Sequence, residues 1–241
     1  MKKLDAFQIK VFALVLMLMD HLWFAFPQVF PMWFHPISRV VSPIFAFLLV
    51  EGFFHTRDRK KYNLRLWGWA VFMQLGNIAI NILLKSKEVS VYNNIFLTLA
   101  LGLTIISVIE NSRSKVGANK LILIAVSILL LPLSIFVEGG MTVIPFILIT
   151  YLFRESDNKK IIGYIILSAI LFKMSYVLYP TVKETIEMLM FNSDFLLILA
   201  VPFILMYNGE RGINNKFSKY LFYVFYPLHL WVLALIEFAL K

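Results

Sequence analysis

Residues 121–137 read LILIAVSILLLPLSIFV, a continuous apolar run without a charged side chain. Residues 161–172, IIGYIILSAILF, form a second run of the same kind. Of the 241 residues, 60% are hydrophobic and 15% are charged, which leaves too little polar surface to cover a soluble core. A membrane β-barrel needs segments of alternating polarity, whereas these runs are continuous. The sequence therefore predicts an all-α, polytopic integral membrane protein.

The gaps between apolar runs differ in their content of lysine and arginine. Five gaps hold most of the positive charge and alternate with poorer ones: 1–10, 55–65, 110–120, 154–160 and 208–219. By the positive-inside rule these five are cytoplasmic, so we expect the N-terminus inside and the C-terminus outside. We expect residues 1–241 to form a single multi-pass domain in the cell membrane. Nine spans are predicted, at 9–27, 37–55, 65–84, 93–110, 120–137, 141–154, 160–178, 194–208 and 219–239.

Composition excludes several kinds of chemistry. The chain has no cysteine, which excludes disulfides and thiol catalysis. Its net charge of +9 lies mainly in the gaps, where membrane topology accounts for it, so we expect no nucleic-acid partner. Glycine-rich phosphate loops and the GxSxG and HExxH motifs are absent. The apolar stretch near the N-terminus lacks a small-residue cleavage site, so we expect it to be retained as the first span.

Ionisable side chains inside the spans are the informative residues, because each costs roughly 2.5–3.5 kcal/mol at the centre of a membrane helix. Positions 10 and 21 of one helix lie about 20° apart around its axis and about 16.5 Å apart along it. This stripe suits a long anionic ligand from the cytosol, with its phosphates at Lys10 and its reactive end at His21. Alternatively, Lys10 only flanks the membrane and His21 makes a hydrogen bond within the bundle.

Asp20 adjoins His21 in sequence but points about 100° away from it around the helix. We therefore expect its partner to come from another span. If that partner is a histidine, Asp20 orients the ring and raises its basicity, as in a base and orienter pair. The alternative is a structural ion pair, with Arg39 as the candidate partner.

The end of the second span carries Glu51, His55 and Arg57, and the first two lie on one helical face. This group either holds a phosphate or nucleotide at the cytosolic surface or caps an ordinary helix end.

The last span carries Tyr226, Pro227 and His229. Proline kinks a helix and frees a backbone carbonyl, which can open a small polar pocket beside the imidazole. Alternatively, the proline and the aromatic residues are those of an ordinary membrane helix. A metal site built from these scattered acids and histidines is chemically possible, but nothing in their positions requires them to converge, and we expect none.

Four segments together resemble the TraX family over essentially the whole chain: LDAFQIKVFALVLMLMDH at 4–21, SPIFAFLLVEGFFHTRDRKKYNLRL at 42–66, NNIFLTLALGL at 93–103 and KYLFYVFYPLHL at 219–230. The resemblance implies a membrane acetyltransferase with acetyl-CoA as donor. The implied acceptor is an amine or hydroxyl, either the N-terminus of a pilin-like peptide or a glycan. The wider group of transmembrane acyltransferases has a basic residue and a histidine flanking ten residues in the first helix, which Lys10 and His21 reproduce.

We infer individual roles for residues in or next to the matching segments. His21 is the expected central base, which deprotonates the acceptor or carries the acetyl group on its imidazole. The other expected participants are Asp20 and His229 in catalysis; Lys10, Arg57, His55 and Arg39 in donor binding; and Asn94, Tyr226 and Glu51 at the acceptor or the developing oxyanion. A secondary transporter or proton-coupled permease, with the buried Asp, Glu and His as a relay, is the alternative.

Overall fold

The computed structural model describes residues 3–241, and the elements within that range are helices, with no strand among them. Extended backbone pairs within it at one isolated parallel bridge, between Leu4 and Tyr207. The prediction of an all-α membrane bundle is confirmed. The α-helices are α1 (Ala6–Ala25), α2 (Phe34–Ser38), α3 (Val41–His55), α4 (Arg59–Leu83), α5 (Ile95–Arg113), α6 (Gly117–Leu130), α7 (Gly140–Leu152), α8 (Asp157–Ser175), α9 (Val182–Phe191), α10 (Val201–Met206) and α11 (Lys216–Leu240). Three 3₁₀ segments join them: η1 (Lys85–Lys87), η2 (Leu131–Phe136) and η3 (Ser193–Ala200).

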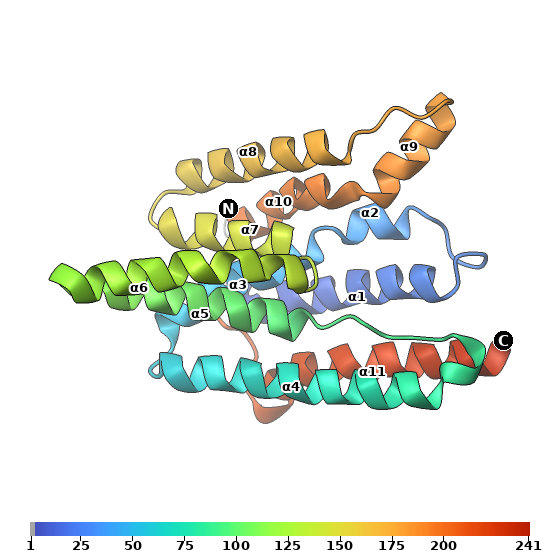
Figure 1. Cartoon of the computed structure of the whole chain (residues 1–241), viewed down its shortest axis with the longest axis horizontal. Helices are drawn as coiled ribbons and strands as arrows, with labels where there is room; N and C mark the ends of the chain where they lie inside the picture. The colour runs from blue at the N-terminus through green and yellow to red at the C-terminus, as the bar shows by residue number, and fades with distance from the viewer. Residues whose placement is uncertain (1–2) are drawn as a thin grey trace.

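Six helical segments of the described chain are long and apolar enough to cross a membrane: α1, α2 with α3, α4, α5, α6 with η2, and α11. A seventh candidate is α9 with the η3–α10 segment, which is bent by 55°. Helix α7 is shorter, and α8 carries three lysines. Successive long segments run back and forth along one axis, and the α3–α4, α5–α6 and α7–α8 connections lie at the same end (Figure 1). The predicted number of nine spans and their predicted orientation remain predictions.

Polar side chains cap the helices where the charged gaps meet the apolar runs. Asp5 begins α1 with a capping box, in which its carboxylate accepts from the backbone N–H of Gln8 at 2.8 Å. Asp58 accepts from the N–H of Lys61 at the start of α4, and Asn215 caps α11 in the same way. Each cap satisfies an otherwise orphaned N–H, so α1, α4 and α11 begin at residues 6, 59 and 216, before the predicted spans at 9, 65 and 219.

The largest departure from the predicted elements lies between residues 179 and 208. The predicted loop contains α9, which Thr181 and Glu184 begin with a capping box. The predicted eighth span is the 3₁₀ segment η3 followed by the short helix α10, which has Pro202 in its first turn. Proline supplies no N–H donor and suits the first turn of a helix, which accounts for the start of α10. The 55° bend lies earlier, at the break between Phe191 and Ser193.

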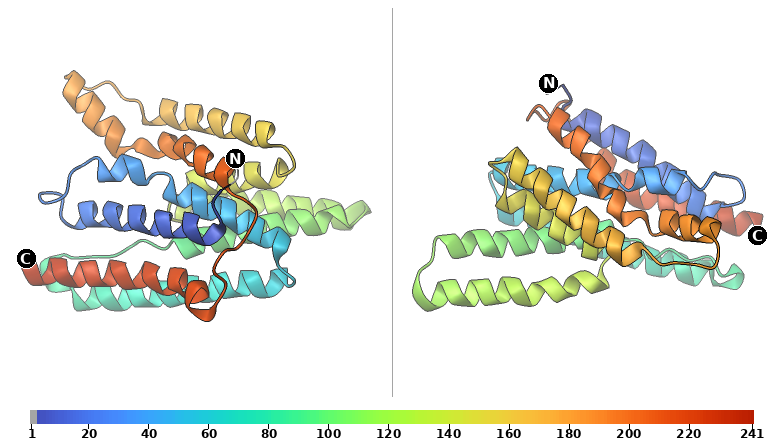
Figure 2. Two further views of the ribbon diagram at one scale, coloured as in Figure 1. Left: turned by 180° about the vertical axis from the view of Figure 1, so that it is seen from behind. Right: turned by 90° about the horizontal axis from the view of Figure 1, so that it is seen from above.

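Small residues set the closest helix contacts. A Cβ atom on Gly102 of α5 would lie 2.4 Å from Ile147 of α7, and one on Gly76 of α4 would lie 2.1 Å from Trp231 of α11. Close approach at glycine is typical of packing between membrane helices. By contrast, α6 lies against α5 at the margin of the bundle, and only 6% of its span window is buried (Figure 2). Its exposed apolar surface suits lipid.

Candidate active site

A cavity of about 1110 Å³ runs through the bundle between α1, α3, α4, α5 and α11. Small-molecule sites usually measure roughly 300–1,000 Å³, so this cavity has room for a large ligand. One end is basic, with Lys10, Arg65 and Arg211 among its lining residues. Glu88 and Glu237 line the opposite end. Asp20, His21, Glu138 and Tyr226 line the section between the two ends.

His21 and His229 meet in this middle section, on α1 and α11. Nδ1 of His21 lies 2.6 Å from Nε2 of His229, and Nδ1 of His229 lies 2.7 Å from the carbonyl oxygen of Phe225. Because a carbonyl only accepts, His229 donates from Nδ1, and its Nε2 in the neutral ring accepts from His21. The hydrogen-bond partners thus assign the free lone pair to Nε2 of His21, which has no hydrogen-bond partner among residues 3–241.

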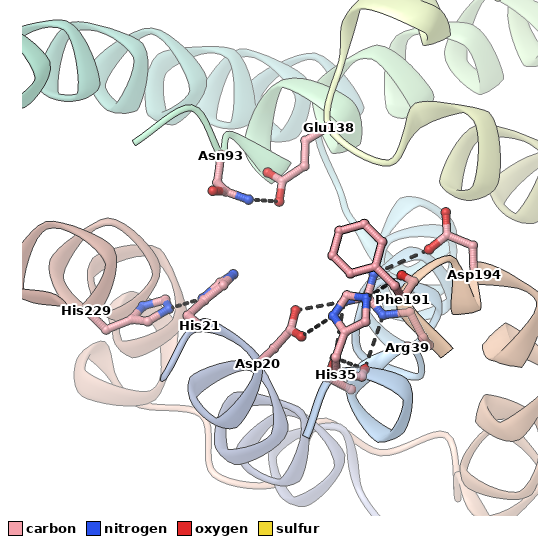
Figure 3. A network of polar contacts seen from close by, with 10 residues as sticks. Asp20, His21, His35, Arg39, Asn93, Glu138, Phe191, Asp194 and His229 are labelled. Carbon is pink, nitrogen blue, oxygen red and sulfur yellow. Dashed lines mark hydrogen bonds and ion pairs between the residues drawn. The ribbon is translucent and has the colours of Figure 1, made fainter. Parts of the chain in front are cut away.

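Asp20 turns away from His21 and is paired elsewhere. Its carboxylate accepts from Nδ1 of His35 at 2.7 Å and from Arg39 at 2.7 Å (Figure 3). The expected partner from another helix, and Arg39 in particular, is confirmed. Nε2 of His35 donates to the carbonyl oxygen of Phe191 at 2.9 Å, so both nitrogens of this ring are occupied. Arg39 also reaches Asp194 at 3.3 Å, which ties α2 to η3.

Glu138 enters the cavity from the turn between η2 and α7, on the side facing His21 (Figure 3). Tyr226 donates to Oε2 of Glu138 at 2.8 Å, and the side-chain amide of Asn93 donates to Oε1 at 2.8 Å. The phenol oxygen of Tyr226 accepts from the N–H of Ile95 at 3.2 Å. Tyr226 therefore lies beside the cavity centre, as expected for a residue of the site, with its hydroxyl committed to Glu138.

Asn94 lies outside the set of residues that line the cavity. Its amide donates to the carbonyl oxygen of Ala70 at 3.0 Å, and its side-chain oxygen caps α5 by accepting from Leu97. The neighbouring Asn93 is the amide that faces the cavity. Any role for Asn94 at an oxyanion remains a prediction.

Some of the residues predicted to bind the donor line the cavity, and one does not. Lys10 lines the cavity on the same side of α1 as His21, which confirms their shared stripe. His55 and Glu51 line the same basic end, and Glu51 pairs with Arg154 at 3.4 Å. Arg57 is exposed and is not among the lining residues. Three cations not singled out from the sequence also line this end: Arg65, Arg211 and Lys219.

The residues that the sequence analysis missed left weak signals. Arg65 and Arg211 stand in basic gaps, where a topological role already accounts for positive charge. Glu138 is the lone acid between two apolar runs and precedes two glycines, a pattern that also suits an ordinary turn. Within residues 3–241, no group of three or more His, Asp or Glu side chains is arranged to hold a metal ion.

Comparison with known proteins gives a match that covers nearly the whole chain, including the residues of the cavity. The model of the family described as TraX protein matches residues 6–237, from the start of α1 almost to the end of α11. The chain belongs to the TraX family. It is also 26% identical over 245 residues to the probable fimbrial assembly protein FimC, serogroup H1, of Dichelobacter nodosus, covering 95% of this chain and 94% of that protein. No solved structure matches the chain. The TraX resemblance is thus confirmed, and the match spans the elements that form the cavity.

Proposed function

We propose that this TraX family member is a membrane-bound acetyltransferase, which moves an acetyl group from cytosolic acetyl-CoA to an amine or hydroxyl of a membrane-associated or exported acceptor. The observation that carries the proposal is the available Nε2 of His21, held toward the cavity by His229. A neutral imidazole with one nitrogen anchored and the other free is suited to act as a general base. The relative from Dichelobacter nodosus is a probable fimbrial assembly protein, which supports a pilin-like peptide as the acceptor, and a glycan is the other candidate.

The basic end of the cavity supports an anionic donor. Lys10, Arg65 and Arg211 line it together, and they offer point charges and planar donor groups to phosphates. The axial distance from position 10 to position 21 of a helix is about 16.5 Å, which suits a donor with phosphates at one end and a thioester at the other. The donor therefore enters with its phosphates last, and its acetyl group reaches His21.

The transfer follows from these positions. The nucleophile of the acceptor forms a bond to the carbonyl carbon of the acetyl group, and the bond from that carbon to sulfur breaks. Nε2 of His21 takes the proton of the nucleophile and passes it to the departing CoA thiolate, so that the ring returns to its neutral form. His229 maintains the tautomer and orientation of His21, which is a positioning role. Transfer through an acetylated His21 uses the same atoms in two steps.

A permease is the second candidate, favoured by one feature of the cavity. Ionisable side chains line it from Lys10 at one end to Glu237 at the other, as a relay or translocation path requires. The two functions differ in their products. An acetyltransferase releases free CoA from acetyl-CoA, whereas a permease leaves the thioester intact.

The test uses the full-length protein in lipid nanodiscs, with acetyl-CoA binding measured by calorimetry and CoA release measured by thiol titration. We expect binding and slow CoA release from the unaltered protein. Arg65→Ala and Lys10→Ala should each weaken acetyl-CoA binding several-fold, and more salt should reduce the difference, because the charges act through a partly solvated end. Lys120→Ala removes an exposed cation off the cavity and is the matched control. An unaltered protein that neither binds acetyl-CoA nor releases CoA would refute the proposal.

A further inference from the structure

Glu138 is held rigidly where it enters the cavity. Its carbonyl oxygen accepts from the hydroxyl of Thr98 at 2.6 Å, which joins the turn to α5. Gly139 has φ +60°, a conformation that side chains disfavour. A Cβ atom on Gly140 would lie 2.2 Å from the carbonyl oxygen of Ser134, so the turn has no room for a larger residue there. The backbone therefore places this carboxyl group at one position.

The hydrogen bonds to Glu138 leave part of its carboxylate unused. The side chains of Asn93 and Tyr226 give one hydrogen bond to each oxygen and the backbone N–H of Asn94 gives a third, whereas an ionised carboxylate accepts about four. No cationic side chain in the described range 3–241 lies within 4.0 Å of it. Asp20, in contrast, is paired with both His35 and Arg39. Glu138 thus has remaining acceptor capacity and no charged partner, although it lines a cavity large enough for a ligand.

Tyr226 links this carboxylate to the histidine pair. Its hydroxyl donates to Glu138, while its ring centroid lies 6.3 Å from that of His21 and 5.8 Å from that of His229. Tyr226 therefore contacts both Glu138 and the histidine pair. Burial raises the pKa of the Glu138 carboxyl, while the hydrogen bonds from Asn93, Tyr226 and the backbone of Asn94 and the charge of Arg39 act in the opposite direction.

We propose that Glu138 is the acceptor-binding residue: its unused acceptor capacity binds an N–H of an amine acceptor, or a second hydroxyl of a polyol acceptor, and leaves the proton of the attacking atom to Nε2 of His21. This inference rests on the proposed acetyltransferase function and identifies its second substrate site. As the nucleophile attacks the carbonyl carbon, positive charge develops on its nitrogen or oxygen until the proton leaves for Nε2 of His21. The carboxylate stabilises that charge, so its contribution is greater in the transition state than in the ground state.

The test compares Glu138→Gln with the unaltered protein in nanodiscs. The probes are glycinamide for an amine acceptor and glycerol for a hydroxyl acceptor, with labelled acetyl-CoA as donor and mass spectrometry of the product. Glutamine keeps the shape and loses the charge. We expect kcat/KM for the probe to fall by roughly 100-fold, the size typical of a lost electrostatic contact in a transition state. Binding of acetyl-CoA should stay within about twofold, because the donor phosphates lie at the other end.

Two further variants separate binding from folding. Glu138→Asp keeps the charge and should recover part of the transfer rate, whereas a purely structural role would not distinguish it from Glu138→Gln at equal thermal stability. Glu187→Gln removes an exposed acid of α9 that is not among the cavity-lining residues, and it should transfer at the normal rate.

The outcomes distinguish this inference from the function on which it rests. Normal transfer by Glu138→Gln, or loss of acetyl-CoA binding and stability in both Glu138 variants, would overturn the acceptor site alone. An unaltered protein that binds acetyl-CoA but acetylates neither probe would also overturn it, because the free lone pairs would then bind no donor group. If the unaltered protein does not bind acetyl-CoA at all, the proposed function fails first.

Discussion

Two histidine clusters in the bundle differ in one respect that decides what each can do. In the first, His35 donates from both ring nitrogens, to Asp20 and to the carbonyl oxygen of Phe191. In the second, His21 is bonded through Nδ1 to His229, and its Nε2 faces the cavity without a hydrogen-bond partner in the described chain. A ring with both nitrogens occupied joins elements together, whereas a ring with one free nitrogen is available for proton transfer. The comparison assigns structure to His35 and chemistry to His21.

The largest expected effect tests that assignment directly. His21→Ala should fold and bind acetyl-CoA but lose turnover by about 10²–10⁴-fold, the usual contribution of a general base. His229→Ala should lose less, because it removes only the group that orients His21. His35→Ala should mainly lower the thermal unfolding temperature. Turnover and unfolding are measured on the same purified samples, since a folding defect otherwise resembles a catalytic one.

Thr150→Val is the control for loss of a buried polar group, because its hydroxyl bonds to Tyr164 and Phe146 away from the cavity. If His21→Ala kept near-normal turnover while His229→Ala abolished it, the reactive group would lie on α11 and the comparison would be reversed.

A smaller effect is expected when the structural cluster loses its acid. Asp20→Asn leaves Arg39 without its 2.7 Å partner in a largely buried position, and the free energy of unfolding should fall by on the order of 3 kcal/mol. The double variant Asp20→Leu with Arg39→Met removes both charges and should be less destabilised. Thermal and denaturant unfolding in detergent measure the difference. Equal stability of Asp20→Asn and the unaltered protein would show that the pair is not structural.

The smallest expected effect concerns the packing that positions His229. Gly76→Ala should push α4 away from Trp231 and cost about 1–3 kcal/mol, as overpacking usually does. Turnover should fall several-fold, because Trp231 lies two residues beyond His229 on α11. Gly68→Ala is the matched control on α4, since its added Cβ meets nothing within 4 Å. Identical stability and turnover of the two variants would show that the contact between Gly76 and Trp231 does not position His229.

The spacing of residues along one helix correctly predicted which side chains share a face of that helix. Helical spacing put Lys10 and His21 on one stripe and turned Asp20 away from His21, and the structure confirms both because each depends on a single helix. Spacing was uninformative where helices break. The predicted loop before residue 194 contains the helix α9, and a 55° bend at the break between Phe191 and Ser193 joins α9 to the η3–α10 segment. Arg65 was passed over because topology already explained its charge.

Order along the chain was enough to identify a bundle of membrane helices and the TraX family, because hydropathy and shared segments are properties of the sequence alone. The contacts between polar side chains of different helices became known from the tertiary structure. Glu138 joins Tyr226 across 88 positions, and His21 joins His229 across 208. The hydrogen-bond partner of a side chain decides whether its lone pair is free, and at such separations that partner is set by how the helices pack.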